Sequence, residues 1–404
     1  MMKMMKEIDG GVTAAKGFRA SGVHCGIRKA KKDVAIIVSD VPAAVSAVFT
    51  LNRTQAAPIV VNKALMQRSK TCRAIVANSG NANACTGEQG MIDAWKMVRS
   101  TAHALGIREE EVLVASTGII GQYLPIERVL TGIAAASQEL SYQGSQSAAE
   151  AIMTTDTFAK SCAISFEIDG KEVRIGGIAK GSGMIAPNMA TMLGFITTDA
   201  KISGKAIRKI FRNGVNRSFN RISVDGDMST NDMAVVMANG LAGNDDIQEG
   251  TEAFEQFASA LEFVMVKLSK LIARDGEGAT KLIEVEVMGA TTEKVALIAA
   301  RSVANSNLVK TAMHGEDANW GRILAAIGYS GIEFEPNDVE LAINGLPFLE
   351  KNYGIVLDEV KAKAALAEEN ISVTIDLNQG EKSAKFWTCD LSKQYVHINA
   401  SYRS

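Results

Sequence analysis

The sequence predicts an α/β protein with more than one compact unit, and three observations support this. The chain has 404 residues, which exceeds one typical domain. Short apolar runs typical of buried strands alternate with segments of helical periodicity. From residue 281 onward, strand patterns dominate. We therefore expect a smaller α/β domain at about residues 281–404.

The first half of the chain mixes predicted strands with a long predicted helix. Residues 88–105 place Met91, Trp95 and Val98 at helical spacing and predict a helix. Four apolar runs predict buried strands, at residues 32–38, 57–61, 73–77 and 112–116. Two further strands, 162–167 and 171–175, flank Asp169-Gly170, a dipeptide typical of a two-residue hairpin.

The second half begins with a glycine-rich segment, residues 177–183, which we expect to be a loop. The apolar, β-branched run 192–198 predicts a strand. Ser203 is a candidate N-cap for a helix through Ile207 and Val215. The remaining predicted elements are helices at 252–273 and 358–370 and strands at 282–287, 295–299, 371–377 and 384–387.

Composition argues against several classes of partner. The formal net charge is −2, which disfavours a nucleic acid or a membrane surface bound through charge. No apolar run approaches the roughly 20 residues of a membrane span, and the polar N-terminus does not resemble a signal peptide. Five cysteines without CxxC spacing favour reduced structural thiols. We therefore expect a cytoplasmic protein.

The candidate nucleophile is Thr191, where the predicted loop meets the predicted strand in GIAKGSGMIAPNMATMLGFITTDA, residues 177–200. A hydroxyl needs an adjacent base, yet the sequence shows no nearby His and no GxSxG motif. If the bond between Ala190 and Thr191 broke, the new α-amine, with a pKa of about 8, could accept the proton. The alternative is a threonine that simply opens a strand.

Three other segments offer groups for acyl transfer. Thr117 and Gly118 follow a predicted strand, where a hydroxyl and an N–H could converge on one oxyanion; the alternative is an ordinary turn. In a P-loop a Gly directly precedes the Lys, whereas here Lys180 precedes Gly181, so we expect no nucleotide site. Lys180 is then either a solvated charge or a group that binds a carboxylate. Glu277, between two glycines, is either a surface charge or a site residue.

Two polar segments suggest metal sites, but their patterns fail. In the run from Asp225 to Asp232, Thr230 stands where a calcium loop needs Gly, and Val236 where it needs Glu. Residues 314–317, HGED, lack further histidines for a tetrahedral set. We expect hydrogen-bonded turns in both places and no metal.

Seven motifs together resemble, nearly residue for residue, the ornithine acetyltransferase family, also called ArgJ. The matching strings are KGSGMIAPNMATMLGFITTDA at 180–200, ANSGNANACTG at 77–87, ASTGIIG at 115–121, MTTDT at 153–157, SFNRISVDGD at 218–227, GEGATK at 276–281 and NWGRI at 319–323. The resemblance implies a self-cleaving ArgJ/DmpA-like fold of layered αββα type, with an N-terminal-nucleophile threonine.

The resemblance also implies cleavage between Ala190 and Thr191, which gives an α chain, 1–190, and a β chain, 191–404. In this family, an acetyl group passes from N2-acetylornithine to glutamate through acetyl-Thr191, in arginine biosynthesis. The family's oxyanion hole corresponds to Thr117 and Gly118. Its substrate-binding residues correspond to Thr157, Lys180, Thr191, Glu277, Asn399 and Ser404.

The resemblance implies no cofactor, with acetyl-CoA as a possible second donor, and an assembly of two α and two β chains. Ala159, Met228 and Ser404 replace a more usual Pro, Thr and Thr, which bears on substrate preference. The alternatives are a self-processing aminopeptidase or amidohydrolase, a non-catalytic small-molecule binding protein, a nucleotide-dependent kinase and an inactive relative.

Overall fold

The computed structural model describes residues 5–186, 192–356 and 358–401. The chain divides into two compact units, which we describe separately. The first comprises Met1–Gly181, Pro187–Asn220 and Met228–Leu268. The second comprises Ser182–Ala186, Arg221–Asp227 and Ser269–Ser404. Residues 187–191, including Ala190 and the candidate nucleophile Thr191, lie outside the described residues, as does Ser404.

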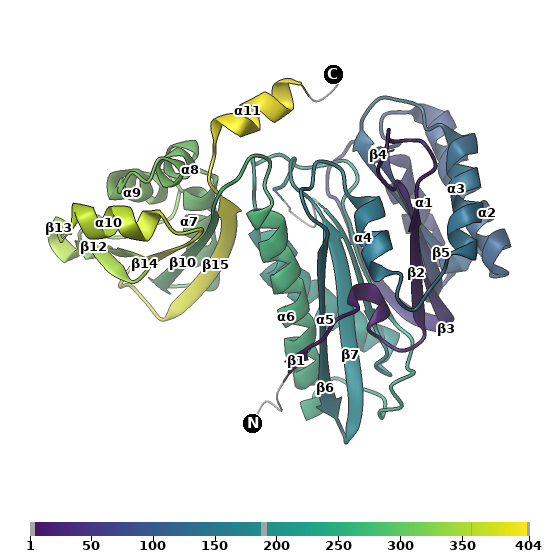
Figure 1. The fold of residues 1–404 in the computed structure, drawn as a ribbon. Coiled ribbons are helices and arrows are strands. Elements are labelled where there is room, and N and C mark those ends of the chain that lie inside the picture. The colour runs from purple at the N-terminus through teal and green to yellow at the C-terminus, as the bar shows by residue number, and fades with distance from the viewer. Residues whose placement is uncertain (1–4, 187–191, 357, 402–404) are drawn as a thin grey trace. The chain divides into compact units, whose positions relative to one another are not determined.

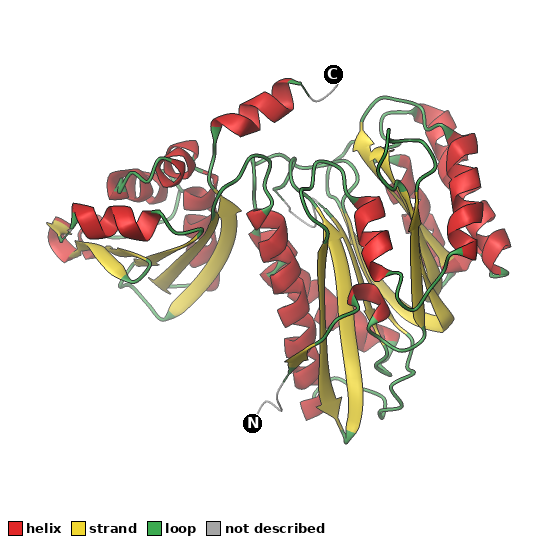
Figure 2. Cartoon of the chain, in the orientation of Figure 1, coloured by secondary structure: helices red, strands yellow, loops and turns green. Residues whose placement is uncertain are grey.

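The first unit alternates strands and helices (Figures 1 and 2). Its strands are β1 (Lys6–Glu7), β2 (Phe18–Val23), β3 (Val34–Phe49), β4 (Thr71–Asn81), β5 (Val112–Ile119), β6 (Lys160–Ile168), β7 (Lys171–Lys180), β8 (Leu193–Thr198) and β9 (Met233–Ala238). Its helices are α1 (Ala57–Arg68), α2 (Gly87–Leu105), α3 (Ile126–Gln138), α4 (Ser145–Ile152), α5 (Gly204–Arg217) and most of α6 (Glu252–Arg274).

The strand β3 connects the two halves of this unit's sheet, whose order is β1-β6-β7-β8-β9-β3-β4-β5 with β2 also paired to β3. Its first half pairs with β2 and β4, and its second half with β9. The pairing of β3 with β4 shifts register between Val38 and Ala43, a stretch that contains Pro42. Because proline cannot donate to a ladder, this is where an irregularity is expected.

Alternate residues of β3 face two different cores. Val34 and Ile36 pack in a core shared with α1, α2 and α3, whereas Ala35 and Ile37 pack in a core shared with β7, β8 and β9. On the outer side of β6, the rings of Phe166 and Phe257 lie 6.5 Å apart and join the strand to α6. The two halves of this one sheet form two inner layers, with helices packed on the outside of each. This arrangement of helix, sheet, sheet and helix confirms the predicted α/β fold of αββα type.

Elements with a local sequence signal follow the prediction. Asp169, with a φ of 49°, and Gly170 turn the hairpin between β6 and β7. The hydroxyl of Ser203 accepts a hydrogen bond from Ala206 N and caps α5. Two expectations were wrong. Residues 57–61 begin helix α1, with Pro58 in its first turn, and residues 177–180 continue β7 instead of forming a loop.

The second unit has a six-stranded sheet of order β13-β12-β11-β14-β10-β15. Its strands are β10 (Leu282–Ala290), β11 (Glu340–Ile343), β12 (Leu346–Glu350), β13 (Gly354–Ile355), β14 (Asn370–Asp376) and β15 (Lys382–Cys389). Its helices are α7 (Glu293–Asn305), α8 (Asn307–His314), α9 (Trp320–Gly328), α10 (Glu359–Leu366) and α11 (Lys393–Ala400).

Helix α7 packs on β10 and β15 and occupies residues predicted as a strand. Thr292 caps it by accepting from Val295 N, and Ala296, Ala300 and Val303 are buried at helical spacing. The predicted strand at 295–299 was therefore wrong. Its five apolar residues are compatible with the periodicity of a helix or of a strand, and the N-cap at Thr292 favours the helix.

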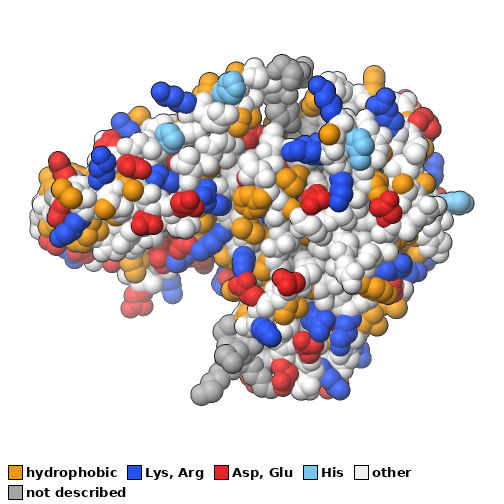
Figure 3. Space-filling model, in the orientation of Figure 1, with side chains coloured by type: hydrophobic (Ala, Val, Ile, Leu, Met, Phe, Trp, Pro, Cys, Tyr) orange, Lys and Arg blue, Asp and Glu red, His pale blue; other side chains and the backbone are white. Residues whose placement is uncertain are grey.

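The surface and the helices bear on possible partners. On the face shown in Figure 3, acidic and basic side chains are interspersed, in keeping with the small net charge. Among the described residues, no helix is both long enough and apolar enough to cross a bilayer.

Candidate active site

In the first unit, two predicted site residues from distant strands are in contact. Lys180 ends β7, and its Nζ donates to Oγ1 of Thr117 in β5, at 3.3 Å. The ammonium is largely buried, whereas Thr117 is half-buried where β5 leaves the core. The contact therefore places a positive charge beside a hydroxyl group at the end of the sheet.

Gly118 occupies a position where no other residue fits. Its φ is 135°, and a Cβ there would lie 2.3 Å from the carbonyl carbon of Gly80 in the neighbouring strand β4. The glycine therefore lets β5 pass close to β4 as far as Thr117 and Gly118. Its half-exposed backbone remains next to the Thr117 hydroxyl.

A buried carboxylate fixes the end of β7. Oδ1 of Asp156 accepts from Nζ of Lys160 at 2.6 Å and from the N–H of Gly181 at 2.8 Å. The side chains of both Asp156 and Lys160 are fully buried. Burial raises the pKa of Asp156, but the ammonium groups of Lys180 and Lys160 outweigh it and hold this pKa well below its usual range. Thr157, the next residue, is exposed.

Asn231 was not singled out from the sequence, yet it connects two segments of the candidate site. Its Nδ2 donates to the carbonyl oxygens of Ala82 and Ser116, the latter at 2.8 Å, and its Oδ1 accepts from the Thr230 hydroxyl. The backbone just before Thr117 is thereby held. The acidic run around Asn231 drew attention only as a calcium loop, and no local pattern reveals a contact over 115 residues.

The second unit brings Glu277 and Asn399 together. Glu277 is only 7% exposed, so it is not a surface charge. Its Oε2 accepts from Nδ2 of Asn399 at 2.8 Å, and its N–H donates to the carbonyl of Ser182. A Cβ on Gly183 would lie 2.4 Å from the Glu277 carboxyl carbon, so this glycine allows the close packing. Asn399 lies in helix α11, not in a frayed tail.

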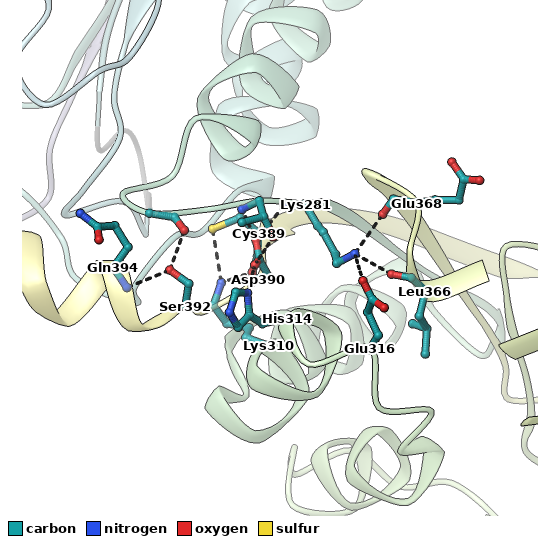
Figure 4. A network of polar contacts seen from close by, with 12 residues as sticks. Lys281, Lys310, His314, Glu316, Leu366, Glu368, Cys389, Asp390, Ser392 and Gln394 are labelled. Carbon is teal, nitrogen blue, oxygen red and sulfur yellow. Dashed lines mark hydrogen bonds and ion pairs between the residues drawn. The ribbon is translucent and has the colours of Figure 1, made fainter. Parts of the chain in front are cut away.

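Asp390 holds the segment that follows Glu277 (Figure 4). Its carboxylate accepts from the N–H groups of Thr280 and Lys281 at 2.7 and 2.8 Å, and Nδ1 of His314 lies 2.8 Å from it. Burial raises the pKa of Asp390, but the hydrogen bonds from the Thr280 hydroxyl and from the two N–H groups outweigh it and lower this pKa. The predicted turn at 314–317 begins one residue later, because His314 is the last residue of helix α8 and Gly315 and Glu316 form the turn.

The start of helix α11 is fixed to the same segment. Ser392 accepts from the N–H of Gln394, and its hydroxyl donates to the Gly278 carbonyl at 2.6 Å (Figure 4). Gly278 has a φ of 71°. The helix that carries Asn399 is thus bonded next to Glu277.

The predicted site residues are distributed over two units. Thr117, Gly118, Thr157 and Lys180 belong to the first unit, and Glu277 and Asn399 to the second. Within residues 5–186, 192–356 and 358–401, no three His, Cys, Asp or Glu side chains are placed to hold a metal ion.

Four of the five thiols are poor nucleophiles near neutral pH. Burial raises the pKa of Cys25 and of Cys72 to about 12, that of Cys162 to about 11, and that of Cys389 above its usual value. Cys85 is exposed.

Replacing Asp156 with Asn should lower the free energy of unfolding at pH 7 by about 3–5 kcal/mol, because the Lys160 ammonium loses the carboxylate that neutralises it. The folded-state pKa of Asp156 is depressed, so its contribution is complete above the unfolded value of about 3.9 and is lost as the pH falls through the folded value. The difference from wild type should therefore shrink in acid. Urea denaturation at several pH values measures it.

Glu150→Gln is the matched control, because it removes the carboxylate of the exposed ion pair with Lys32. Its expected cost is below about 1 kcal/mol. Equal losses in the two variants would contradict the importance of the buried pair.

Comparison with known proteins finds one family along nearly the whole chain. The model of the ArgJ family matches residues 19–404. The arginine biosynthesis bifunctional protein ArgJ of Caldanaerobacter subterraneus subsp. tengcongensis is 53% identical over 404 residues, covering 99% of this chain and 100% of that protein. The protein of the same name from Symbiobacterium thermophilum is 54% identical over 403 residues, with the same coverage.

Among solved structures, the crystal structure of arginine biosynthesis bifunctional protein argJ from Bacillus halodurans is 42% identical. It covers 47% of this chain and 100% of that one, with a TM-score of 0.45. The family match from residue 19 to residue 404, and identities above half with relatives of the same length, show that the chain belongs to the ArgJ family.

Proposed function

We propose that the chain is a self-processing acetyltransferase that carries the acetyl group of N2-acetylornithine to glutamate. The observation that carries this proposal is the ArgJ family match over residues 19–404. Members of this family are acyltransferases of arginine biosynthesis, and this chain is one of them. The contact between Lys180 and Thr117 in the first unit supports the proposed chemistry.

Processing would come first. The hydroxyl of Thr191 attacks the carbonyl of Ala190, and the peptide bond is replaced by an ester. This exchange frees the Thr191 α-amine, and water then hydrolyses the ester, which releases the Ala190 carboxylate and the Thr191 hydroxyl and leaves chains 1–190 and 191–404. The amine, with an unperturbed pKa of about 8, then serves as the base for its own hydroxyl.

Acetyl transfer would follow in two steps. The Thr191 hydroxyl attacks the acetyl carbonyl of N2-acetylornithine, its proton passes through the amine to the leaving nitrogen, and ornithine departs. The α-amine of glutamate then attacks the acetyl ester and regenerates Thr191. Thr117 and Gly118 would stabilise the tetrahedral oxyanion, each donor contributing about 3–4 kcal/mol.

Substrate binding is assigned to Thr157, Lys180, Glu277, Asn399 and Ser404, together with Thr191. The Lys180 ammonium suits a substrate carboxylate, and the Glu277 carboxylate suits an amino group. Glu277 is buried and hydrogen-bonded to Asn399, which supports this role, because an acidic side chain is rarely buried unless it is paired or functional.

The remaining assignments follow from the same family. We propose that the enzyme needs no cofactor, accepts acetyl-CoA as a second donor, works in the cytoplasm and assembles from two α and two β chains. A self-processing aminopeptidase would use the same nucleophile but hydrolyse its acyl-enzyme. The ratio of transfer to hydrolysis with N2-acetylornithine and glutamate therefore separates the two activities.

Intact-mass spectrometry tests the nucleophile. The purified protein should consist of two chains that meet between Ala190 and Thr191, and N2-acetylornithine should add one acetyl group to the second chain. Thr191→Ala should remain a single uncut chain without transferase activity, because it has no hydroxyl. Thr191→Ser, which keeps a hydroxyl, is the matched control and should be cut. An uncut wild-type protein with full activity would refute the proposal.

Glu277→Gln tests substrate binding. The amide keeps an oxygen for Asn399 but loses the charge, so the KM for N2-acetylornithine should rise about 10- to 100-fold if the carboxylate holds an amino group. A fall in kcat would instead assign Glu277 to proton transfer. Glu369→Gln, in an exposed ion pair with Arg274, is the control. Wild-type kinetics in Glu277→Gln would remove this residue from the site.

A further inference from the structure

Asn231 is a buried amide that joins the ends of two strands of the first unit. The residue is 6% exposed. Its Nδ2 donates to the carbonyl oxygen of Ser116 at 2.8 Å and to that of Ala82 at 2.5 Å. Ser116 belongs to β5, and Ala82 directly follows β4. Because carbonyl oxygens only accept hydrogen bonds, the nitrogen of the amide must face them both.

These hydrogen bonds close a ring around residues 117–118, the proposed oxyanion hole. Ser116 directly precedes this pair and Ile119 directly follows it. The N–H of Ala82 donates to the carbonyl of Ile119 at 3.0 Å, while the carbonyl of Ala82 accepts from Asn231. The backbone is thus held on both flanks of the pair, directly at Ser116 and through Ala82 at Ile119.

Strand β5 needs such support because it is an end strand of its sheet, paired with β4 on one side. On its other edge, the N–H and the carbonyl of Val114 bond to the side-chain amide of Asn62 at 2.9 and 2.7 Å. The carbonyl of Ser116, two residues on, bonds to Asn231. Backbone groups of alternate residues point to the same edge of a strand, so the next N–H on this edge is that of Gly118.

The Asn231 amide is itself held in place. Its Oδ1 accepts from the hydroxyl of Thr230 at 2.6 Å, and its backbone N–H donates to Oγ of Ser229 at 3.1 Å. Thr230 is 7% exposed. Both ends of the amide are therefore bonded inside the protein, which fixes its orientation.

We propose that Asn231 is a positioning residue for acetyl transfer: its amide holds Ser116 and Ala82 so that the Thr117 hydroxyl and the Gly118 N–H face one oxyanion. This inference rests on the proposed function. Asn231 acts through the backbone and not on the substrate. A donor stabilises the oxyanion only within hydrogen-bond reach, so a displacement of about 1 Å slows the chemical step and leaves substrate binding unchanged.

Asn231→Ala removes both donors and tests the proposal. Acetylation in a single turnover is measured by intact mass over a range of N2-acetylornithine concentrations and is counted on cleaved protein only. The maximal rate should fall about 10- to 100-fold, because a whole oxyanion donor is worth about 100- to 1,000-fold. The half-saturating concentration should stay within about twofold of wild type. An amide that served stability alone would change neither quantity in the folded, cleaved protein.

Thr230 offers a milder pair of variants. Thr230→Val removes the hydroxyl that orients the Asn231 amide at nearly the same volume, so the maximal rate should fall about 3- to 10-fold. Thr230→Ser keeps the hydroxyl and should stay within about twofold of wild type.

Asn244→Ala is the matched control. Asn244 is buried, its Nδ2 donates to the carbonyls of Lys201 and Asp245 at 3.1 and 2.6 Å, and its Oδ1 accepts from the N–H of Lys201. It therefore makes the same kinds of bond as Asn231, but to the segment that follows β8. Its loss should lower stability without changing the rate of acetylation.

Three results would overturn the inference: acetylation of cleaved Asn231→Ala at the wild-type rate, an equal loss of rate in Asn244→Ala, or a change confined to the half-saturating concentration. If Asn231→Ala does not fold or is not cut, Thr230→Val decides. A wild-type rate in that variant, or no cleaved protein at all, would also contradict the inference, because a role in folding would then explain both variants. An uncut wild-type protein with full activity would instead refute the proposed function itself.

Discussion

The buried carboxylate of Asp156 is the interaction on which the first unit's part of the candidate site depends. It neutralises Lys160 inside the core and binds the N–H of Gly181, so the chain leaves β7 at a defined point. The position of Lys180 beside Thr117 follows from that point. Without this carboxylate, the ammonium groups of Lys160 and Lys180 would be buried without the negative charge that neutralises them. Substitution of Asp156 is therefore expected to destabilise the fold.

The first unit's part of the site is built from segments that are far apart in sequence and meet at one end of its sheet. Lys180 reaches Thr117 over 63 residues, and Asn231 reaches Ser116 over 115. Strand β7 pairs antiparallel with β8, and β8 pairs parallel with β9. The end of β7 and the starts of β8 and β9 therefore lie side by side, and the contact of Lys180 with Thr117 adds the end of β5. Register, not a local motif, brings these segments together. These contacts are stable because the polar groups that form them are hydrogen-bonded to each other in a buried region.

The sequence predicts features whose chemistry is local. Asp169-Gly170 specifies a hairpin through its own backbone preferences, and Ser203 caps a helix three residues away. Apolar runs of five residues at 57–61 and 295–299 were misassigned, because a buried helix and a buried strand look alike at that length. Thr117 and Lys180 were found through motifs, but their contact and the burial of Glu277 depend on the assembled fold.

The strand order has a consequence for the life of the protein once the bond before Thr191 is broken. Strands β8 and β9 would then belong to one polypeptide, yet they lie between β7 and β3 of the other, bonded on both sides. The two chains could not separate on dilution unless the hydrogen bonds of β8 to β7 and of β9 to β3 were broken. Refolding of the cleaved protein from denaturant would be a bimolecular reaction, whereas the uncleaved precursor folds as a single chain. The enzyme would thus persist through slow unfolding, not through a reversible equilibrium.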